Sequence, residues 1–110
     1  MELHVNRIEI VGRVGQVRVN EYGDSKTVAN FSVITEVVMK RHGSIISEST
    51  WHNVTAWEGP AVASFDKLQK GSLVKVVGRL RNSKYTGADG IERIYTEILA
   101  SSLDILPREG

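Results

Sequence analysis

The chain has 110 residues, which is enough for one domain, and we expect a single domain over residues 1–110. Hydrophobic residues make up 41% and charged residues 25%, which is ordinary globular usage and argues against disorder. No cysteine is present, which excludes disulfides and thiolate metal sites, and a net charge of +1 means that polyanion binding would need a local basic surface. No apolar run has the length of a membrane span and no secretory signal is visible, so we expect a cytoplasmic protein without membrane contact.

Strand patterns dominate the first part of the chain. Apolar residues alternate over residues 5–19, and the alternation changes parity at Gly15, which predicts a bulge or bend there. Residues 21–25 have the composition of a turn. A second strand is predicted over residues 27–38, with Phe31 on its apolar face.

The second part of the chain predicts three strands and one helix. Residues 40–49 are polar and contain a glycine, so we expect a longer loop before a strand at 49–57. Pro60 suits the first position of a helix, and the apolar spacing that follows predicts a short amphipathic helix ending near Leu68. The remaining elements are a strand, a hairpin turn and a strand, at 72–85, 87–90 and 91–104.

This order of elements predicts the fold class. Five strands with one short helix between the third and the fourth is the order of an OB-fold, an all-β, five-stranded Greek-key barrel whose face and loops bind oligonucleotides. An SH3-like barrel and an α+β sandwich are the competing architectures, and neither usually places its single helix at that point.

Both tryptophans of the chain lie on the third predicted strand. Side chains alternate across a strand, so Trp51 and Trp57 share a face with Asn53 and Thr55, while apolar residues such as Val54 face the core. Exposed tryptophan is uncommon without a partner. Base stacking is one explanation, and burial of a ring under the 40–49 loop or in a subunit interface is the other.

The fourth predicted strand carries positive charge on its solvent side. From position 72 to 85 the chain has four basic residues and no acid. Cations that pair with phosphates, beside aromatic rings that stack on any base, are the means of holding single strands without sequence readout. The alternative is a solvated strand edge that discourages aggregation. The residues on this side are Lys75, Arg79, Arg81 and Tyr85, and Lys84 is the fourth basic residue of the stretch.

Several short motifs fall in register along nearly the whole chain: Asn6-Arg7-Ile8 with Val11–Gln16, Val28–Phe31, Trp51–Val54, Lys70-Gly71-Ser72, Val77–Leu80 and Lys84-Tyr85-Thr86. Together they resemble the bacterial-type single-stranded DNA-binding protein family. The resemblance implies sequence-independent binding of single-stranded DNA, which protects single strands in replication, recombination or repair. It also implies a homotetramer, with a dimer as the alternative, and an organellar location if the source is eukaryotic.

The resemblance assigns roles to individual residues. The base-stacking aromatics of the family fall on Trp51, Trp57 and Tyr85, and Met39 stands where the family has a fourth aromatic, either packing on a base or filling space. His52 matches a position that the family places at a subunit interface. The basic residues expected to contact DNA are Arg7, Arg13, Lys70, Lys75, Arg79, Arg81 and Lys84.

The end of the chain departs from the family. Members usually carry a long linker and an acidic tip, whereas this sequence ends at Pro107-Arg108-Glu109-Gly110, so we expect a tail-less or truncated member. Two other functions stay open: a primosome accessory protein of the same fold, and a protein-interaction barrel.

We expect no enzyme, cofactor, bound metal or small-molecule substrate. His4, His42 and His52 lack metal-ligand spacing, and the acidic residues form no paired-carboxylate arrangement. The segment Gly12–Gly15 matches the GxxG of a KH loop, but that loop joins two helices and this segment interrupts a strand.

Overall fold

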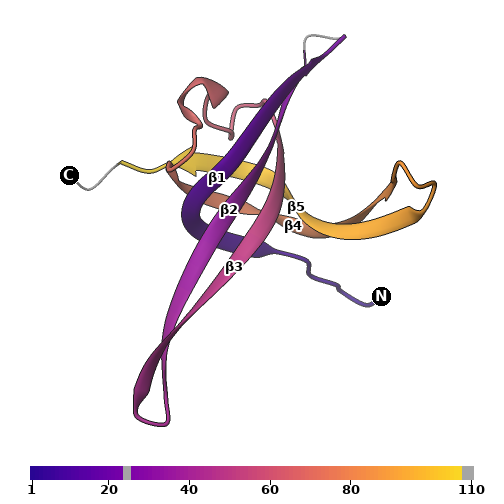
Figure 1. Cartoon of the computed structure of the whole chain (residues 1–110). Coiled ribbons are helices and arrows are strands. Elements are labelled where there is room, and N and C mark those ends of the chain that lie inside the picture. The colour runs from indigo at the N-terminus through magenta and orange to yellow at the C-terminus, as the bar shows by residue number, and fades with distance from the viewer. Residues whose placement is uncertain (24–25, 108–110) are drawn as a thin grey trace.

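The computed structural model describes residues 1–23 and 26–107, which form a closed five-stranded barrel. The strands follow one another around it in the order β1-β2-β3-β5-β4 (Figure 1). The β3–β5 pair is parallel and the other pairs are antiparallel. The predicted all-β OB-fold is therefore confirmed. The strands are β1 (Ile8–Tyr22), β2 (Lys26–Arg41), β3 (Ser44–Trp57), β4 (Leu73–Thr86) and β5 (Glu92–Ile105).

β1 is bent at the predicted bulge. Its pairing with β2 shifts register between Val14 and Val17, on either side of Gly15. Residues 8–13 pair with β4 and residues 13–22 pair with β2, so one strand belongs to two walls of the barrel. The parity change in the sequence thus marks the point at which β1 turns from one wall to the next.

The prediction of a loop over residues 40–49 is wrong. β2 and β3 continue as one hairpin up to the pair Arg41–Ser44, and His42 and Gly43 make the turn with φ of 51° and 79°. A two-residue turn with positive φ at both positions matches the twist of the flanking strands. Ile45 and Ile46 follow the turn, and such β-branched residues favour a strand although residues 40–49 are largely polar.

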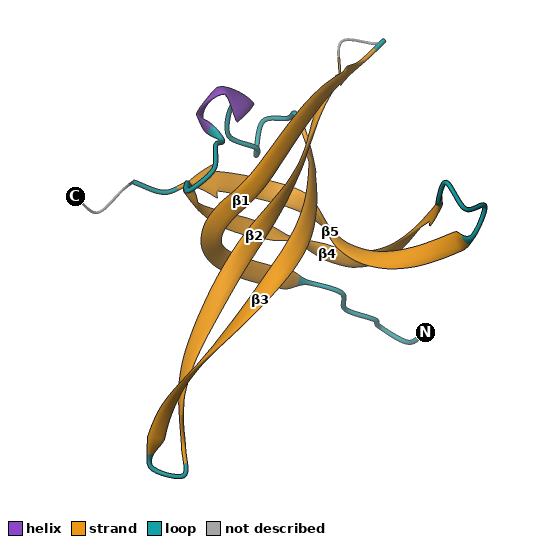
Figure 2. Ribbon diagram, viewed as in Figure 1, coloured by secondary structure: helices purple, strands orange, loops and turns teal. Residues whose placement is uncertain are grey.

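The amphipathic helix predicted between Pro60 and Leu68 is also mostly wrong. The helical part is one 3-10 turn, η1 (Phe65–Lys67), seen as the purple segment of Figure 2. Backbone hydrogen bonds join Ala63 N to Leu103 O and Leu103 N to Ala61 O, at 2.9 and 3.1 Å. Residues 61–63 thus pair with β5, which prevents them from forming a helical turn.

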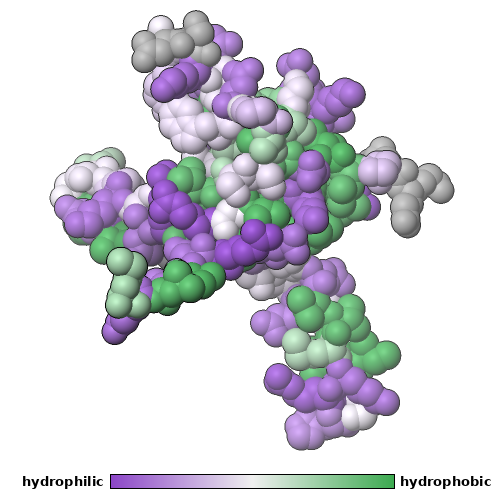
Figure 3. Space-filling model, turned by 180° about the vertical axis from the view of Figure 1, so that it is seen from behind, coloured by the Kyte–Doolittle hydropathy of each residue, from purple (hydrophilic) through white to green (hydrophobic). Residues whose placement is uncertain are grey.

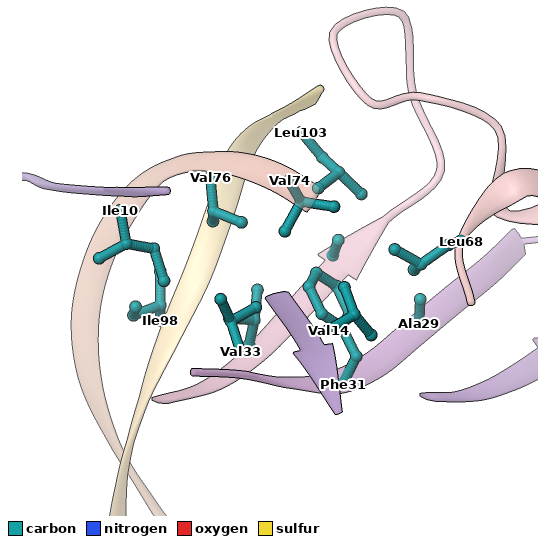
Figure 4. Packing of buried hydrophobic residues seen from close by; sticks show 12 residues of the cluster. Ile10, Val14, Ala29, Phe31, Val33, Leu68, Val74, Val76, Ile98 and Leu103 are labelled. Carbon is teal, nitrogen blue, oxygen red and sulfur yellow. The ribbon is translucent and has the colours of Figure 1, made fainter. Parts of the chain in front are cut away.

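The barrel interior is filled by side chains from all five strands (Figure 4). The predicted inward alternation holds for Val54, Ala56, Val74 and Val76, which are all buried. Leu80 has the same strand parity as Val74 and Val76, but it is exposed because β1 stops pairing with β4 at Gly78 and β4 leaves the barrel beyond that point. The core residues are Ile10, Val14, Ala29, Phe31, Val33, Val54, Ala56, Leu68, Val74, Val76, Ile98 and Leu103.

Two hairpins extend well beyond the barrel (Figure 1). We call residues 35–50 the β2–β3 arm and residues 81–97 the β4–β5 arm. The radius of gyration is 16.2 Å, whereas a compact chain of about 100 residues has roughly 13 Å. No helix among residues 1–23 and 26–107 is long and apolar enough to cross a membrane.

Ile98 gives a test of the packing. Ile98→Ala removes a fully buried side chain where β5 meets β3 and should lower the free energy of unfolding by about 2–5 kcal/mol. Ile94→Ala, on the exposed part of the same strand, is the control and should change it by less than about 0.5 kcal/mol. Urea unfolding measures both, and equal losses would contradict the core assignment.

Candidate nucleic-acid interface

The two tryptophans are exposed on β3. Trp51 is 60% exposed and Trp57 is 42% exposed. Asn53 between them is exposed as expected, but Thr55 is 7% exposed, so the expectation that this whole face meets solvent is wrong at that residue. Thr55 is buried because its hydroxyl lies in a hydrogen-bonded cluster with Asn30 and Glu97.

Trp51 lies against the bulge of β1. A Cβ built on Gly15 would fall 2.6 Å from the Trp51 ring and 2.7 Å from Ser32 Oγ. The absence of a side chain at Gly15 therefore gives the indole ring its place across β1. Ser32 Oγ in turn accepts a hydrogen bond from the Gln16 N–H at 3.0 Å, which holds the bulge beside the ring. The contact leaves most of the ring exposed, so the alternative in which a 40–49 loop covers it does not apply to Trp51.

Trp57 has an aromatic neighbour that the sequence analysis missed. The ring centroids of Tyr22 and Trp57 are 5.7 Å apart with an interplanar angle of 35°. The composition of residues 21–25 predicts a turn that includes Tyr22, but Tyr22 is the last residue of β1 and pairs with Lys26. The register of β1, β2 and β3 brings the two rings together, and the sequence does not show that register.

Tyr85 also has a neighbour, Tyr95, on the β4–β5 arm. Their ring centroids are 5.7 Å apart and the rings are tilted by 63°. Tyr95 pairs with Ser83, and Tyr85 pairs with Arg93, so both tyrosines lie on one face of this arm. The alternation within residues 91–104 was the signal that could have shown Tyr95 on an outward face.

A hollow of about 920 Å³ lies between these aromatic groups. One side is the bulge of β1, which also touches Trp51, and another includes Asn53, which lies between the two tryptophans on β3. Tyr95 and the residues that follow η1 complete it. The hollow thus links the β3 face to the β4–β5 arm. Its lining is Gly15, Gln16, Val17, Arg18, Asn20, Asn30, Phe31, Ser32, Asn53, Val54, Thr55, Leu68, Gln69, Lys70, Tyr95 and Glu97.

A buried carboxylate, Glu97, forms part of the hollow. Arg81 Nε donates to Glu97 Oε1 at 2.6 Å, and Ser83 Oγ donates to the same oxygen at 3.0 Å. Thr55 Oγ1 donates to Glu97 Oε2 at 3.0 Å. Burial by itself would raise the pKa of Glu97, but these hydrogen bonds and the charge of Arg81 outweigh it and hold the pKa below the ordinary carboxyl value. Glu97 is therefore ionised at neutral pH.

The expected basic residues are dispersed over the surface. Lys70 lines the large hollow, where it is joined by Arg18, a residue that the sequence analysis did not select. Arg7 and Arg79 line a second hollow of about 300 Å³ near the N-terminal segment. Arg13 donates to the carbonyl of Gly71 at 3.2 Å.

Three of the expected cations are paired with acids. Lys75 lies 3.4 Å from Glu9, Lys84 lies 3.6 Å from Glu92, and Arg81 is bound to Glu97. The first two pairs are exposed and cost little to open. Arg81 differs because its partner is buried, so its charge is largely offset. The large hollow is thus less positive than the strand pattern suggested.

Met39 and His52 lie on the other face of the β2–β3 ribbon. Met39 pairs with Ile46 and His52 pairs with Val33, whereas Trp51 pairs with Ile34 on the opposite parity. His52 Nε2 lies 2.9 Å from Thr35 Oγ1, and partial burial lowers the pKa of His52. Across residues 1–23 and 26–107, no cluster of three or more His, Cys, Asp or Glu could hold a metal ion.

Comparison with known proteins places this geometry in a family. The model of the Single-strand binding protein family matches residues 5–106. The chain belongs to this family. It is 35% identical over 106 residues to a single-stranded DNA-binding protein of Neisseria meningitidis serogroup A, covering 94% of this chain and 61% of the relative. The corresponding protein of Xanthomonas campestris is 32% identical, with 96% and 63% covered. The chain therefore spans about three fifths of the length of these bacterial relatives.

Two further likenesses come from eukaryotes. The mitochondrial single-stranded DNA-binding protein 1-B of Xenopus laevis is 28% identical over 116 residues, with 96% of this chain and 78% of the relative covered. Among solved structures, the Plasmodium falciparum SSB in complex with single-stranded DNA superposes with a TM-score of 0.77 at 25% identity. That match covers 97% of this chain and 99% of the other.

Gly15 allows a test of the Trp51 position. Gly15→Ala places a methyl group inside the contact with the indole ring, so the ring must move outward while the backbone stays. In a Trp57→Phe background, where Trp51 is the one tryptophan, acrylamide quenching of its fluorescence should increase. Gly59→Ala, whose Cβ would have its nearest neighbour at 3.9 Å, is the control and should leave quenching unchanged. Unchanged quenching in Gly15→Ala would contradict the contact.

Glu97 gives a pH test. Its pKa is lowered in the folded state, so its ionised form stabilises the fold above the ordinary carboxyl range, and this contribution is lost as pH falls through the folded-state pKa. Glu97→Gln should be less stable than the wild type at pH 7, and the difference should shrink toward pH 3. Urea midpoints across this range measure the difference. A constant difference would show that the charge of Glu97 plays no part.

Proposed function

We propose that this chain binds single-stranded DNA without sequence preference and thereby protects single strands during replication, recombination or repair. The observation that carries the proposal is the pair of exposed tryptophans on β3, which face solvent beside the large hollow. Membership of the single-strand binding family and the fold match to a complex with single-stranded DNA support it.

Base stacking supplies the sequence-independent part of the affinity. Every base has a π face, and one base stacked on an aromatic side chain contributes about 1–3 kcal/mol. Trp51 and Trp57 are separated by six positions on β3, or roughly 20 Å at 3.3 Å per residue, which leaves room for several nucleotides between the rings. Tyr85 extends the stacking surface onto the β4–β5 arm.

Phosphate contacts come from cations at the edges of this path. Of the expected cations, Lys70 lines the same hollow as Asn53, which lies between the two tryptophans on β3. Neutralised phosphates release counterions, which makes the affinity fall with salt. Further contacts come from Arg7, Arg13, Lys75, Arg79, Arg81 and Lys84, and Met39 packs against a base further along the β2–β3 arm.

The protein acts as a homotetramer that needs no cofactor and catalyses no reaction. His52 lies at a subunit interface, on the ribbon face opposite the tryptophans. Relatives from bacteria and from mitochondria support a cytoplasmic or an organellar setting.

One observation favours protein interaction as a second function. The β2–β3 arm exposes four aliphatic side chains outside the barrel, and Figure 3 shows green surface on this arm, which extends to the lower right. Val37 and Ile46 lie on one face of the ribbon and Val38 and Ile45 lie on the other, so each face carries two exposed aliphatic side chains that a protein partner could cover.

Tryptophan variants test the proposed function. Trp51→Ala and Trp57→Ala should each weaken binding of a fluorescein-labelled oligothymidylate by about 1–3 kcal/mol, because each loses one stacked base. Fluorescence anisotropy measures the affinity, and urea unfolding checks that the fold is kept. Val37→Ala, an exposed change on the β2–β3 arm away from the tryptophan face, is the control. Wild-type affinity in both tryptophan variants would point to the protein-interaction function instead.

A further inference from the structure

Tyr95 occupies a position that none of the expected stacking residues fills. It is 38% exposed, it lines the large hollow, and it lies beside Tyr85. We propose that Tyr95 is a further base-stacking residue, and that the hollow beside it receives a base while the phosphates stay outside. This inference rests on the proposed binding of single-stranded DNA.

The position of Tyr95 connects two aromatic groups that are otherwise separate. Trp51 lies over Gly15, and Gly15 lines the hollow. Asn53, between the two tryptophans, lines it as well. Tyr95 lies on another side of the hollow, on the same face of the β4–β5 arm as Tyr85. A strand that passes from the tryptophans to Tyr85 thus meets Tyr95 on the way.

The angle between the two tyrosines sets the path of such a strand. The rings are tilted by 63°, so a base stacked flat on Tyr95 cannot lie parallel to a base stacked on Tyr85. The backbone of the strand must therefore turn between these two positions. A turn of this kind directs one base away from the β4–β5 arm and into the hollow.

The charges around the hollow favour a base over a phosphate inside it. Glu97 is nearly fully buried and ionised, and it accepts hydrogen bonds from Arg81, Ser83 and Thr55. A phosphate placed against Glu97 would meet a like charge, which disfavours that position. The exposed cations Arg18 and Lys70 also line the hollow, where they can meet phosphates that remain in solvent.

The uncharged groups of the hollow suit any base. Asn53 carries an exposed amide that can both donate and accept, whereas the Asn30 carbonyl already accepts from Thr55 and leaves the Asn30 amino group to donate. An amide that rotates to match the base edge gives hydrogen bonds without selecting one base. The hollow therefore agrees with binding that lacks sequence preference.

Met39 does not compete with Tyr95 for the position next to the tryptophans. It lies on the opposite face of the β2–β3 ribbon from Trp51, because Met39 pairs with Ile46 while Trp51 pairs with Ile34. A strand on the tryptophan face therefore reaches Met39 only after it passes around the edge of the β2–β3 arm. Tyr95 lies directly on the path through the hollow.

The test compares two substitutions on two ligands. Tyr95→Ala removes the ring and Tyr95→Phe keeps it, while Ile94→Ala, on the opposite face of the same strand, is the matched control. The ligands are a labelled oligothymidylate and a strand of equal length made of abasic residues, and anisotropy measures affinity at fixed salt. Tyr95→Ala should weaken oligothymidylate binding about 5- to 150-fold, the range that loss of one stacked base gives.

The abasic strand separates stacking from other effects. With no base to stack, Tyr95→Ala should bind it as the wild type does, and Tyr95→Phe and Ile94→Ala should resemble the wild type on both ligands. Unchanged oligothymidylate affinity in Tyr95→Ala would overturn the inference, and so would an equal loss on the abasic strand. If the wild type itself does not bind oligothymidylate, the proposed function fails, which is a different result.

Discussion

The barrel is closed between β3 and β5 by a short parallel contact, in which Val54 pairs with Ile98 and Thr55 pairs with Leu99. The side chains next to this contact reinforce it, since Thr55 on β3 donates to Glu97 on β5 and Glu97 is bound by Arg81 on β4. A buried carboxylate is stable only when its oxygens are satisfied, so these groups depend on one another. The position of β3 relative to the β4–β5 arm follows from this closure.

The same closure sets the geometry of the proposed interface. β3 carries both tryptophans, and the β4–β5 arm carries the two tyrosines. The hollow between them is lined by Thr55 and Glu97, which belong to the closing contact. The proposed interface is thus built on strands next to this junction, with aromatic rings on either side. Such preorganisation lowers the entropy lost when a flexible single strand binds.

Much of this arrangement could be predicted from the sequence because alternation is a local property. The parity of residues 51–57 showed that the tryptophans share a face, and the parity change at Gly15 showed the bulge. Alternation failed where partners override it. Thr55 is buried by groups on β2 and β5, and residues 61–63 pair with Leu103 and so do not form a helix.

The missed aromatic residues have the same explanation. Tyr22 and Tyr95 gain importance from neighbours that are distant in sequence, Trp57 for the first and the hollow for the second. The pairing of Arg81 with Glu97 likewise depends on the register of β4 and β5. Local patterns predicted which residues could bind, whereas the register between strands decides which of them act together.

The exposed tryptophans on this barrel are proposed to stack on the bases of single-stranded DNA. The most direct measurement is a titration with oligothymidylate followed by intrinsic tryptophan emission, with a duplex of equal length as the comparison. Stacking should quench the emission with the single strand, and the duplex, whose bases are already stacked, should quench it far less. Emission that does not change with the single strand, or that responds equally to the duplex, would contradict the claim.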